Sequence, residues 1–316
     1  MDCCVPSFEH LTGEVRTSST TEVPVAAPQA DPTANVVALE GEFLMGTRST
    51  ERQRRDGEDP VRKITLSPFY IEKTSVTNKQ FAEFVDTTGY VTEAEQFGWS
   101  FVFHQFVSDE VAGTVDQAVT EVPWWWKVDG SYWRHPEGPG SSMDDRLDHP
   151  VVHASWNDAV AFATWSGKRL PTEAEWEFAA RGGLEQAIYP WGDELTPGGQ
   201  HMCNVWQGDF PDVNTVEDGH AGTAPVTAFE PNGYGLYNVS GNVWEWCADW
   251  FSRRHHVGGP RGNPKGPSVG QSKIAKGGSY LCHKSYCNRY RPSARTASTP
   301  DSSTGHMGFR LAMDAA

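Results

Sequence analysis

Two cysteines lie five residues apart in the segment GGSYLCHKSYC, residues 277–287, among hydroxyl groups and a histidine. Along an α-helix this separation would turn the two side chains roughly 140° apart. Along a strand it would place them on opposite faces of the sheet. Cys282 and Cys287 can therefore meet only if the chain between them is irregular. A loop that brings two thiols together is more often built for chemistry than for scaffolding.

The residues alone leave several kinds of site open. The first ten residues, MDCCVPSFEH, lack the basic and apolar parts of a secretory signal, so we expect a cytoplasmic protein with reduced thiols rather than a disulfide. Zinc would need a fourth ligand besides Cys282, His283 and Cys287, and the spacing fits no common zinc pattern. A soft ion such as Cu(I), a redox-active pair and two unrelated buried cysteines all remain compatible with the sequence.

Two other segments are rich in side-chain oxygens. They are residues 204–220, NVWQGDFPDVNTVEDGH, and residues 236–246, LYNVSGNVWEW. Hard cations such as Ca²⁺ bind six to eight oxygens from carboxylates, amides and backbone carbonyls. Neither segment has the spacing of an EF-hand, and turns with solvated acidic side chains would have the same composition. The residues are thus consistent with calcium sites and with ordinary turns.

The composition narrows the class of protein. The 316 residues carry a formal net charge of −15, which argues against nucleic acid as a partner because binding it requires a basic face. There is no apolar run of about 18 residues, so we expect no membrane span. The chain also holds 13 Trp, 31 Gly and 21 Pro, which favours an irregular fold whose loops are fixed by large aromatic side chains.

The elements that must position these residues can be placed from local patterns. We expect a disordered leader over residues 1–35 and one ordered domain over 36–316. Alternation predicts strands over about 36–46 and 61–70. Capping boxes predict three helices, which begin at Thr77, Ser155 and Thr172 and end near Gly89, Gly167 and Gly182. Beyond residue 183 we expect long irregular segments, clamped by packing or by ions.

Five stretches resemble the formylglycine-generating enzymes, also called sulfatase-modifying factors. They are HPVVHASWNDAVAFATWSGKRLPTEAEWEFAARGG (149–183), CNVWQGDFP (203–211), PNGYGLYNVSGNVWEW (231–246), GGSYLCHKSYCNRYR (277–291) and TPDSS…GFR (299–310). The similarity covers about residues 36–316, and the two-cysteine motif is its most specific part. The resemblance implies an irregular α/β (α+β) single domain with little regular secondary structure, distantly similar to C-type lectins.

The resemblance also implies an activity. Enzymes of this family use O₂ and Cu(I) to oxidise the cysteine of a Cys-x-Pro-x-Arg segment in an unfolded sulfatase to Cα-formylglycine. Cys282 and Cys287 would hold the copper, and the substrate cysteine would be a third sulfur ligand. Ser279 and Tyr286 correspond to active-site hydroxyls, and Trp244 corresponds to a tryptophan that lines the pocket.

Further residues acquire roles by the same resemblance. Two calcium sites correspond to two sets of residues, in which valine and glycine act through their carbonyls: Asn204, Val205, Asp218 and His220, and Asn238, Gly241, Val243 and Glu245. The aromatic insert 97–133 is expected to form part of a groove wall for an extended peptide. His306 and Ser298 replace asparagines of vertebrate members near that groove and could alter its peptide preference.

Two rival functions share this superfamily. One is a non-catalytic binding module, which is disfavoured because such relatives lack the cysteine pair. The other is a non-haem iron sulfoxide synthase, which needs an additional helical domain with histidine ligands. The chain itself adds one hypothesis: Cys4-Val5-Pro6-Ser7 reads as Cys-x-Pro-x, with Phe8 in place of arginine. This stretch could be a pseudo-substrate, a thiol pair that passes copper to the site, or an exposed tail without a role.

Overall fold

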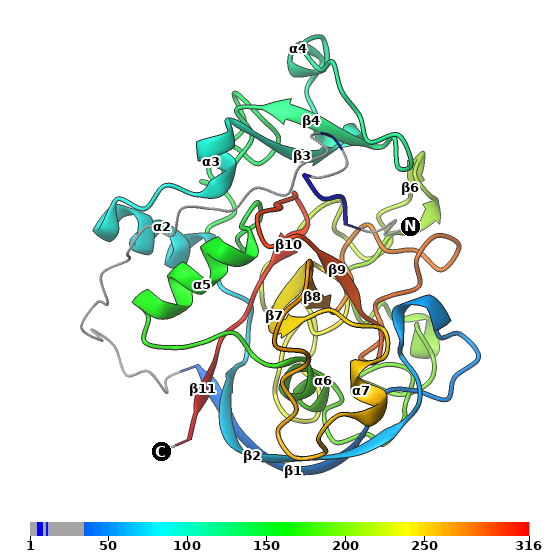
Figure 1. Ribbon diagram of the computed structural model, residues 1–316. Helices are drawn as coiled ribbons and strands as arrows, with labels where there is room; N and C mark the ends of the chain where they lie inside the picture. The colour runs from blue at the N-terminus through cyan, green and yellow to red at the C-terminus, as the bar shows by residue number, and fades with distance from the viewer. Residues whose placement is uncertain (1–4, 9–10, 12–34, 316) are drawn as a thin grey trace.

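The computed structural model describes residues 5–8, 11 and 35–315 (Figure 1), apart from the side chain of residue 255. Most of the predicted leader therefore lies outside the described residues. Residues 5–8 differ from the prediction of disorder, because all four are buried against the domain. Within the described residues, no helix is long and apolar enough to cross a membrane.

The first sheet is built on the two strands that alternation predicts. β1 (Val36–Met45) pairs antiparallel with β2 (Arg62–Glu72), and both strands lie within two residues of their predicted bounds. Along β2, Ile64 and Leu66 are buried, whereas Lys63 and Thr65 are exposed. A third strand, β11 (Ala312–Asp314), pairs antiparallel with β2 and returns the end of the chain to its beginning.

A second sheet carries the residues around the cysteine pair. Its order is β10-β7-β8-β9, with bounds β7 (Trp244–Trp250), β8 (Lys273–Lys276), β9 (Thr296–Ser298) and β10 (Met307–Gly308). β10 runs parallel to β7, and the other pairs are antiparallel. The segment with Cys282 and Cys287 is part of the connection between β8 and β9.

The three predicted helices are present with their caps. They are α2 (Asn78–Thr88), α5 (Trp156–Trp165) and α6 (Glu173–Ala180), and each begins with a complete capping box. Such a box satisfies backbone N–H groups that the first turn leaves without a helical partner. All eight residues of α6 are buried, including three glutamates, so its polar side chains must find partners inside the protein.

The remaining elements are short, as the lack of periodicity predicts. The insert contributes α3 (Glu93–Phe97), β3 (Trp99–Phe103), α4 (Asp109–Ala112) and β4 (Trp125–Asp129), and β3 pairs antiparallel with β4. The later part has β5 (Gly208–Asp209), β6 (Val213–Asn214) and α7 (His255–Gly258). Single 3₁₀ turns span Arg54–Asp56, His104–Phe106 and Pro197–Gly199.

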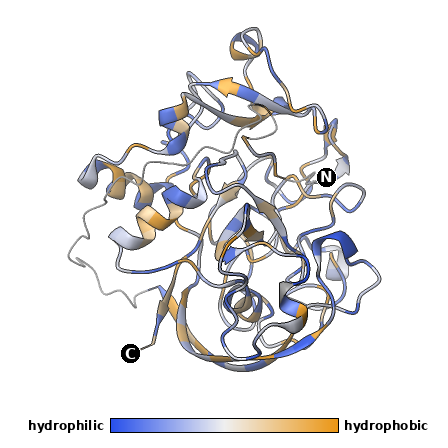
Figure 2. Ribbon diagram, in the orientation of Figure 1, coloured by the Kyte–Doolittle hydropathy of each residue, from blue (hydrophilic) through white to orange (hydrophobic). Residues whose placement is uncertain are grey.

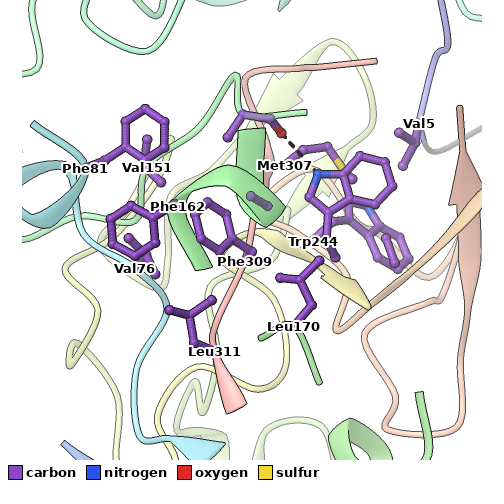
Figure 3. Close-up of a cluster of buried hydrophobic side chains, with 14 of the residues drawn as sticks. Val5, Val76, Phe81, Val151, Phe162, Leu170, Trp244, Met307, Phe309 and Leu311 are labelled. Carbon is purple, nitrogen blue, oxygen red and sulfur yellow. Dashed lines mark hydrogen bonds between the residues drawn. The ribbon is translucent and has the colours of Figure 1, made fainter. Parts of the chain in front are cut away.

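The core is strongly aromatic. α5 is largely hydrophobic in Figure 2, and its Phe162 packs with Phe81 and Phe309 at ring distances of 5.8 and 5.5 Å. The same cluster extends through Trp244 and Met307 to Val5 (Figure 3). It also includes both Cys282 and Cys287. The predicted site is therefore an extension of the core rather than a surface feature.

Candidate active site

The cysteine segment is irregular, as the spacing of the thiols requires. After β8 the chain turns through Gly277 and Gly278, whose φ angles of 94° and 74° lie in the left-handed region. A Cβ on Gly278 would stand 2.8 Å from the Tyr290 Cα, so this position suits only glycine. Backbone N–H groups of Cys282 and Cys287 then donate to the carbonyls of Ser279 and His283 at 2.9 and 3.0 Å.

These turns place both thiols in one buried hydrophobic cluster. Cys282 and Cys287 are each 1% exposed and share a cluster with Trp244 and Tyr290. Burial is the main cause that raises the pKa of the Tyr290 phenol, and both thiols contribute to the same shift by their proximity. The backbone N–H of Ser279 donates to the Cys282 sulfur at 3.4 Å.

Cys203 and Cys247 are the other cysteines that the structure describes, and both are buried free thiols. Cys203 belongs to the same cluster as the pair, whereas Cys247 packs in a different one. Burial raises the pKa of each well above its usual range, which disfavours the thiolate.

The predicted pocket residues lie around the pair. Ser279 is fully buried, and its hydroxyl accepts from the N–H of Leu281 at 3.3 Å. The Tyr286 ring stacks on Phe210 at 4.5 Å and meets Trp124 edge to face at 5.0 Å. The buried indole N–H of Trp244 has no hydrogen-bond partner among the described residues. A donor without a partner inside a pocket is available to a ligand.

The donor set suits a soft ion better than zinc or iron. Among the described residues there is no group of three or more His, Cys, Asp and Glu side chains that could hold a metal. His283 is half-exposed, and its Nδ1 contacts the Ser285 hydroxyl at 2.7 Å instead of joining the buried thiols. What remains is a pair of sulfurs in apolar surroundings, which is the ligand type that Cu(I) prefers.

The structure brings the first predicted calcium set together. The Asp218 carboxylate accepts from the backbone N–H groups of Val205 and His220 at 3.1 and 2.9 Å. The side-chain oxygen of Asn204 is buried without a partner among the described residues. Sequence reasoning missed Gln207, whose side-chain amide contacts both the Val205 carbonyl and Asp218. The only local feature that could have indicated Gln207 is its position in this oxygen-rich loop.

The second set fits a cation only in part. Asn238 again has a buried side-chain oxygen without a partner in the described structure. The Glu245 carboxylate, which the resemblance predicts as a ligand, makes four hydrogen bonds to protein groups. One oxygen accepts from Ser75 and Arg310 at 3.0 and 2.7 Å, and the other accepts from Trp176 and Arg310 at 2.7 and 2.5 Å. Glu245 is thus the centre of a buried ion pair.

The two sets are nevertheless close neighbours. Asn204 forms an isolated parallel bridge with Gly241, and the N–H of Asn242 donates to the Asn204 carbonyl at 2.8 Å. A Cβ on Gly241 would lie 2.1 Å from that carbonyl oxygen, so only glycine allows the approach. Gly241 thus serves the contact between the two loops, and Val243 is buried beside Gly308.

The predicted groove residues meet the aromatic insert. His306 is buried with its ring 4.5 Å from that of Trp125, and its Nδ1 contacts the Thr304 hydroxyl at 2.7 Å. Ser298 lies at the end of β9, and its hydroxyl donates to the Pro6 carbonyl at 3.3 Å. Ser302 was not singled out from the sequence, although its hydroxyl accepts from the N–H of Phe8 at 2.9 Å.

Comparison with known proteins agrees with this fold. Residues 20–315 match the family described as the sulfatase-modifying factor enzyme 1-like domain. The chain is 60% identical to the formylglycine-generating enzyme of Thermomonospora curvata over 93% of this chain and 97% of that protein. It is 46% identical to the inactive C-alpha-formylglycine-generating enzyme 2 of Bos taurus, over 90% and 89%. The solved structure of PvdO from Pseudomonas aeruginosa shares the fold, with a TM-score of 0.66 at 22% identity over 93% of this chain and 100% of that one.

The fold and the cysteine pair define a protein of mixed α/β structure, low in regular elements, with a buried two-thiol site. The chain belongs to the formylglycine-generating enzyme family, whose members activate sulfatases by forming formylglycine from a cysteine. Because this family includes an inactive relative, the activity of this chain has to be argued from its own residues.

Proposed function

We propose that this protein is a copper-dependent oxidase that converts the cysteine of a Cys-x-Pro-x-Arg segment in an unfolded sulfatase to Cα-formylglycine with O₂. The observation that carries the proposal is the pair of buried thiols at Cys282 and Cys287 in a cluster of hydrophobic side chains. Among the described residues, no group of three or more His, Cys, Asp and Glu side chains could hold a metal. Such a pair of thiols selects Cu(I) over Zn²⁺ or Ca²⁺, and two-coordinate copper leaves room for a third sulfur.

The reaction balances with a reductant. One thiol, one O₂, two electrons and two protons give one aldehyde, one H₂S and one water, so the carbon–sulfur bond of the substrate breaks as a carbon–oxygen double bond forms. Copper, when bound, would supply the activation of O₂. The chain would supply the thiolate ligands, and the backbone N–H of Ser279 donates to the sulfur of Cys282. The hydroxyls of Ser279 and Tyr286 and the N–H of Trp244 would orient the reacting thiol or oxygen, and the aromatic walls would exclude water.

We also propose a structural Ca²⁺ at the first oxygen set. Asn204 and Asp218 would supply side-chain oxygens, and Val205 and His220 would supply carbonyls. The buried, unpartnered oxygen of Asn204 supports this assignment, because such an atom is costly unless something satisfies it. For a Ca²⁺ at the second set, the only support is the buried side-chain oxygen of Asn238, which has no partner among the described residues.

Mass spectrometry of a Cys-x-Pro-x-Arg peptide tests the oxidase proposal directly. After incubation in air with Cu(I)-loaded protein and a reductant, the peptide should lose its sulfur and gain an aldehyde. Cys282→Ser and Cys287→Ser should each reduce turnover by at least about 1000-fold, because one remaining thiolate cannot hold the ion in a two-sulfur site.

Cys247→Ser is the matched control, since Cys247 is equally buried but packs in a different cluster. It should keep its activity. An unmodified peptide, with copper loading verified and several flanking sequences tried, would contradict the proposal and favour a non-catalytic binding protein.

A further inference from the structure

Residues 5–8 lie against the domain, beside the predicted groove residue Ser298 and the aromatic insert. Val5 and Phe8 are 1% and 4% exposed, and Pro6 and Ser7 between them are buried as well. In Figure 1 this dark blue segment runs between the β3–β4 sheet and the ends of β9 and β10. Burial of two large apolar side chains favours this docked position, against the entropy of ordering the chain.

The contacts to the backbone of this segment do not depend on its sequence. The N–H of Phe8 donates to the Ser302 hydroxyl at 2.9 Å. The Pro6 carbonyl accepts from the Ser298 hydroxyl at 3.3 Å. Two serine hydroxyls that pair with main-chain groups of this segment form contacts that other peptides can share.

The segment also has a defined direction in the groove. Val5 packs in the cluster that contains Trp244, Cys282 and Cys287, and Figure 3 shows it beside Trp244 and Met307. Phe8, at the other end, packs against the aromatic insert. Its ring meets Phe97 at 4.6 Å, Trp99 at 4.3 Å and Phe101 at 5.8 Å. The segment therefore runs from the core cluster that includes both thiols, at Val5, toward the insert, at Phe8.

This direction matches the proposed substrate. Residues 4–8 read Cys-Val-Pro-Ser-Phe, so the proline of Cys-x-Pro-x-Arg corresponds to Pro6 and the arginine corresponds to Phe8. Cys4 itself lies outside the described residues. Aromatic ring faces also accept a guanidinium group, so the pocket that holds Phe8 suits the arginine of a substrate.

We propose that residues 5–8 are an intramolecular pseudosubstrate, which occupies the peptide groove and competes with the sulfatase segment. The inference rests on the proposed function for the identity of the competing peptide. A tethered segment acts at an effective concentration of the order of millimolar, so even weak docking is effective. The apparent affinity for an external peptide falls in proportion to the fraction of molecules with an open groove.

Equilibrium binding separates this inference from the proposed function. The probe is a fluorescein-labelled peptide that contains Ala-Thr-Pro-Ser-Arg between flanking residues of a sulfatase. Alanine replaces the reacting cysteine, so that no turnover occurs. Fluorescence anisotropy should give a Kd about tenfold lower for Val5→Asp/Phe8→Asp, and for a deletion of residues 1–10, than for the unaltered chain.

The matched control is Val15→Asp/Val23→Asp, which places the same two charges elsewhere in the leader. Its Kd should equal that of the unaltered chain. Equal Kd values for all forms would overturn the pseudosubstrate. If no form binds the probe, the proposed substrate is wrong. Hydrogen exchange then tests separately whether residues 5–8 are docked on the domain.

Hydrogen exchange of the Phe8 amide supplies that second measurement. The hydrogen bond to Ser302 should protect this amide at least about tenfold relative to a free peptide of residues 3–11, and Ser302→Ala should remove the protection. Saturation with the binding probe should remove it too. An unprotected Phe8 amide in the unaltered chain would overturn the inference whether or not the protein is an oxidase.

Discussion

Glu245 shows how a buried charge can organise this molecule at the scale of a residue. Its carboxylate accepts hydrogen bonds from Ser75, from Trp176 and from Nε and Nη2 of the Arg310 guanidinium. Glu245 and Arg310 are 1% and 0% exposed, so neither can turn to water if its partner is lost. The remaining N–H groups of Arg310 donate to the carbonyls of Glu72, Lys73 and Tyr237, which ties the first sheet to the second.

Replacement of this arginine tests the assignment of Glu245 as an ion-pair centre. Arg310→Gln should lower the free energy of unfolding by about 3–5 kcal/mol, because it leaves a buried carboxylate without its counter-charge. Urea denaturation measures the change. Lys63→Gln, which removes the exposed ion pair of Lys63 with Glu42, should cost less than about 1 kcal/mol. Similar losses for the two variants would contradict the prediction.

At the scale of elements, the helix caps also join one helix to another. Asp158 completes the capping box of α5, and it accepts from the Tyr90 hydroxyl and the N–H of Glu93 at 2.9 and 3.1 Å. Glu93, in the first turn of α3, is only 3% exposed and has one carboxylate oxygen without a partner in the described structure. Burial, reinforced by the negative charge of Asp158, raises the pKa of Glu93 to about 7.

The raised pKa predicts a pH dependence of stability. Between about pH 4.5 and 7 the folded protein keeps a proton on Glu93 that the unfolded chain loses, so stability should fall as pH rises through this window. Glu93→Gln removes this dependence on the Glu93 proton. Its free energy of unfolding should exceed that of the unaltered chain by about 1–3 kcal/mol at pH 8, with little gain at pH 4. Urea midpoints at several pH values measure it. Exposed Glu83→Gln is the control, and a gain independent of pH would refute the account.

At the scale of the whole molecule, long irregular segments are fixed by contacts between distant parts of the chain. The two oxygen-rich loops meet at the bridge between Asn204 and Gly241, and Gly241 in turn donates its N–H to the carbonyl of Gly277 beside the cysteine segment. An ion bound at the first loop would therefore stiffen the approach to the thiols. This is the physical reason to expect calcium to stabilise the fold as a whole.

Thermal melting with and without calcium measures this effect. At a concentration 100 times its Kd, Ca²⁺ should stabilise the folded state by about 2.7 kcal/mol, so EDTA should lower the Tm and Ca²⁺ should restore it. Asp218→Asn should abolish the shift, because it removes the charged ligand. Asp212→Asn, at an exposed carboxylate of the same segment, should preserve it. A Tm of the unaltered chain that does not respond to Ca²⁺ would exclude the site.

The sequence by itself determined those features whose cause is local. Thr77, Ser155 and Thr172 begin helices because the residues that complete each cap stand three positions later. Alternation placed β1 and β2, and the odd spacing of Cys282 and Cys287 required the irregular segment that the structure has. The family resemblance identified the fold for the same reason, since its motifs are contiguous stretches.

Only the tertiary structure decided how distant groups are used. Glu245 lies in a motif rich in potential ligands, yet Arg310, 65 positions away, takes its carboxylate. Phe8 belongs to a stretch with the composition of a disordered leader, yet Trp99 and Ser302 offer it a ring pocket and a hydroxyl. Contacts between residues so far apart in the chain produce no periodic pattern in the sequence. The energies of these contacts depend on burial and geometry, which arise only in the folded protein.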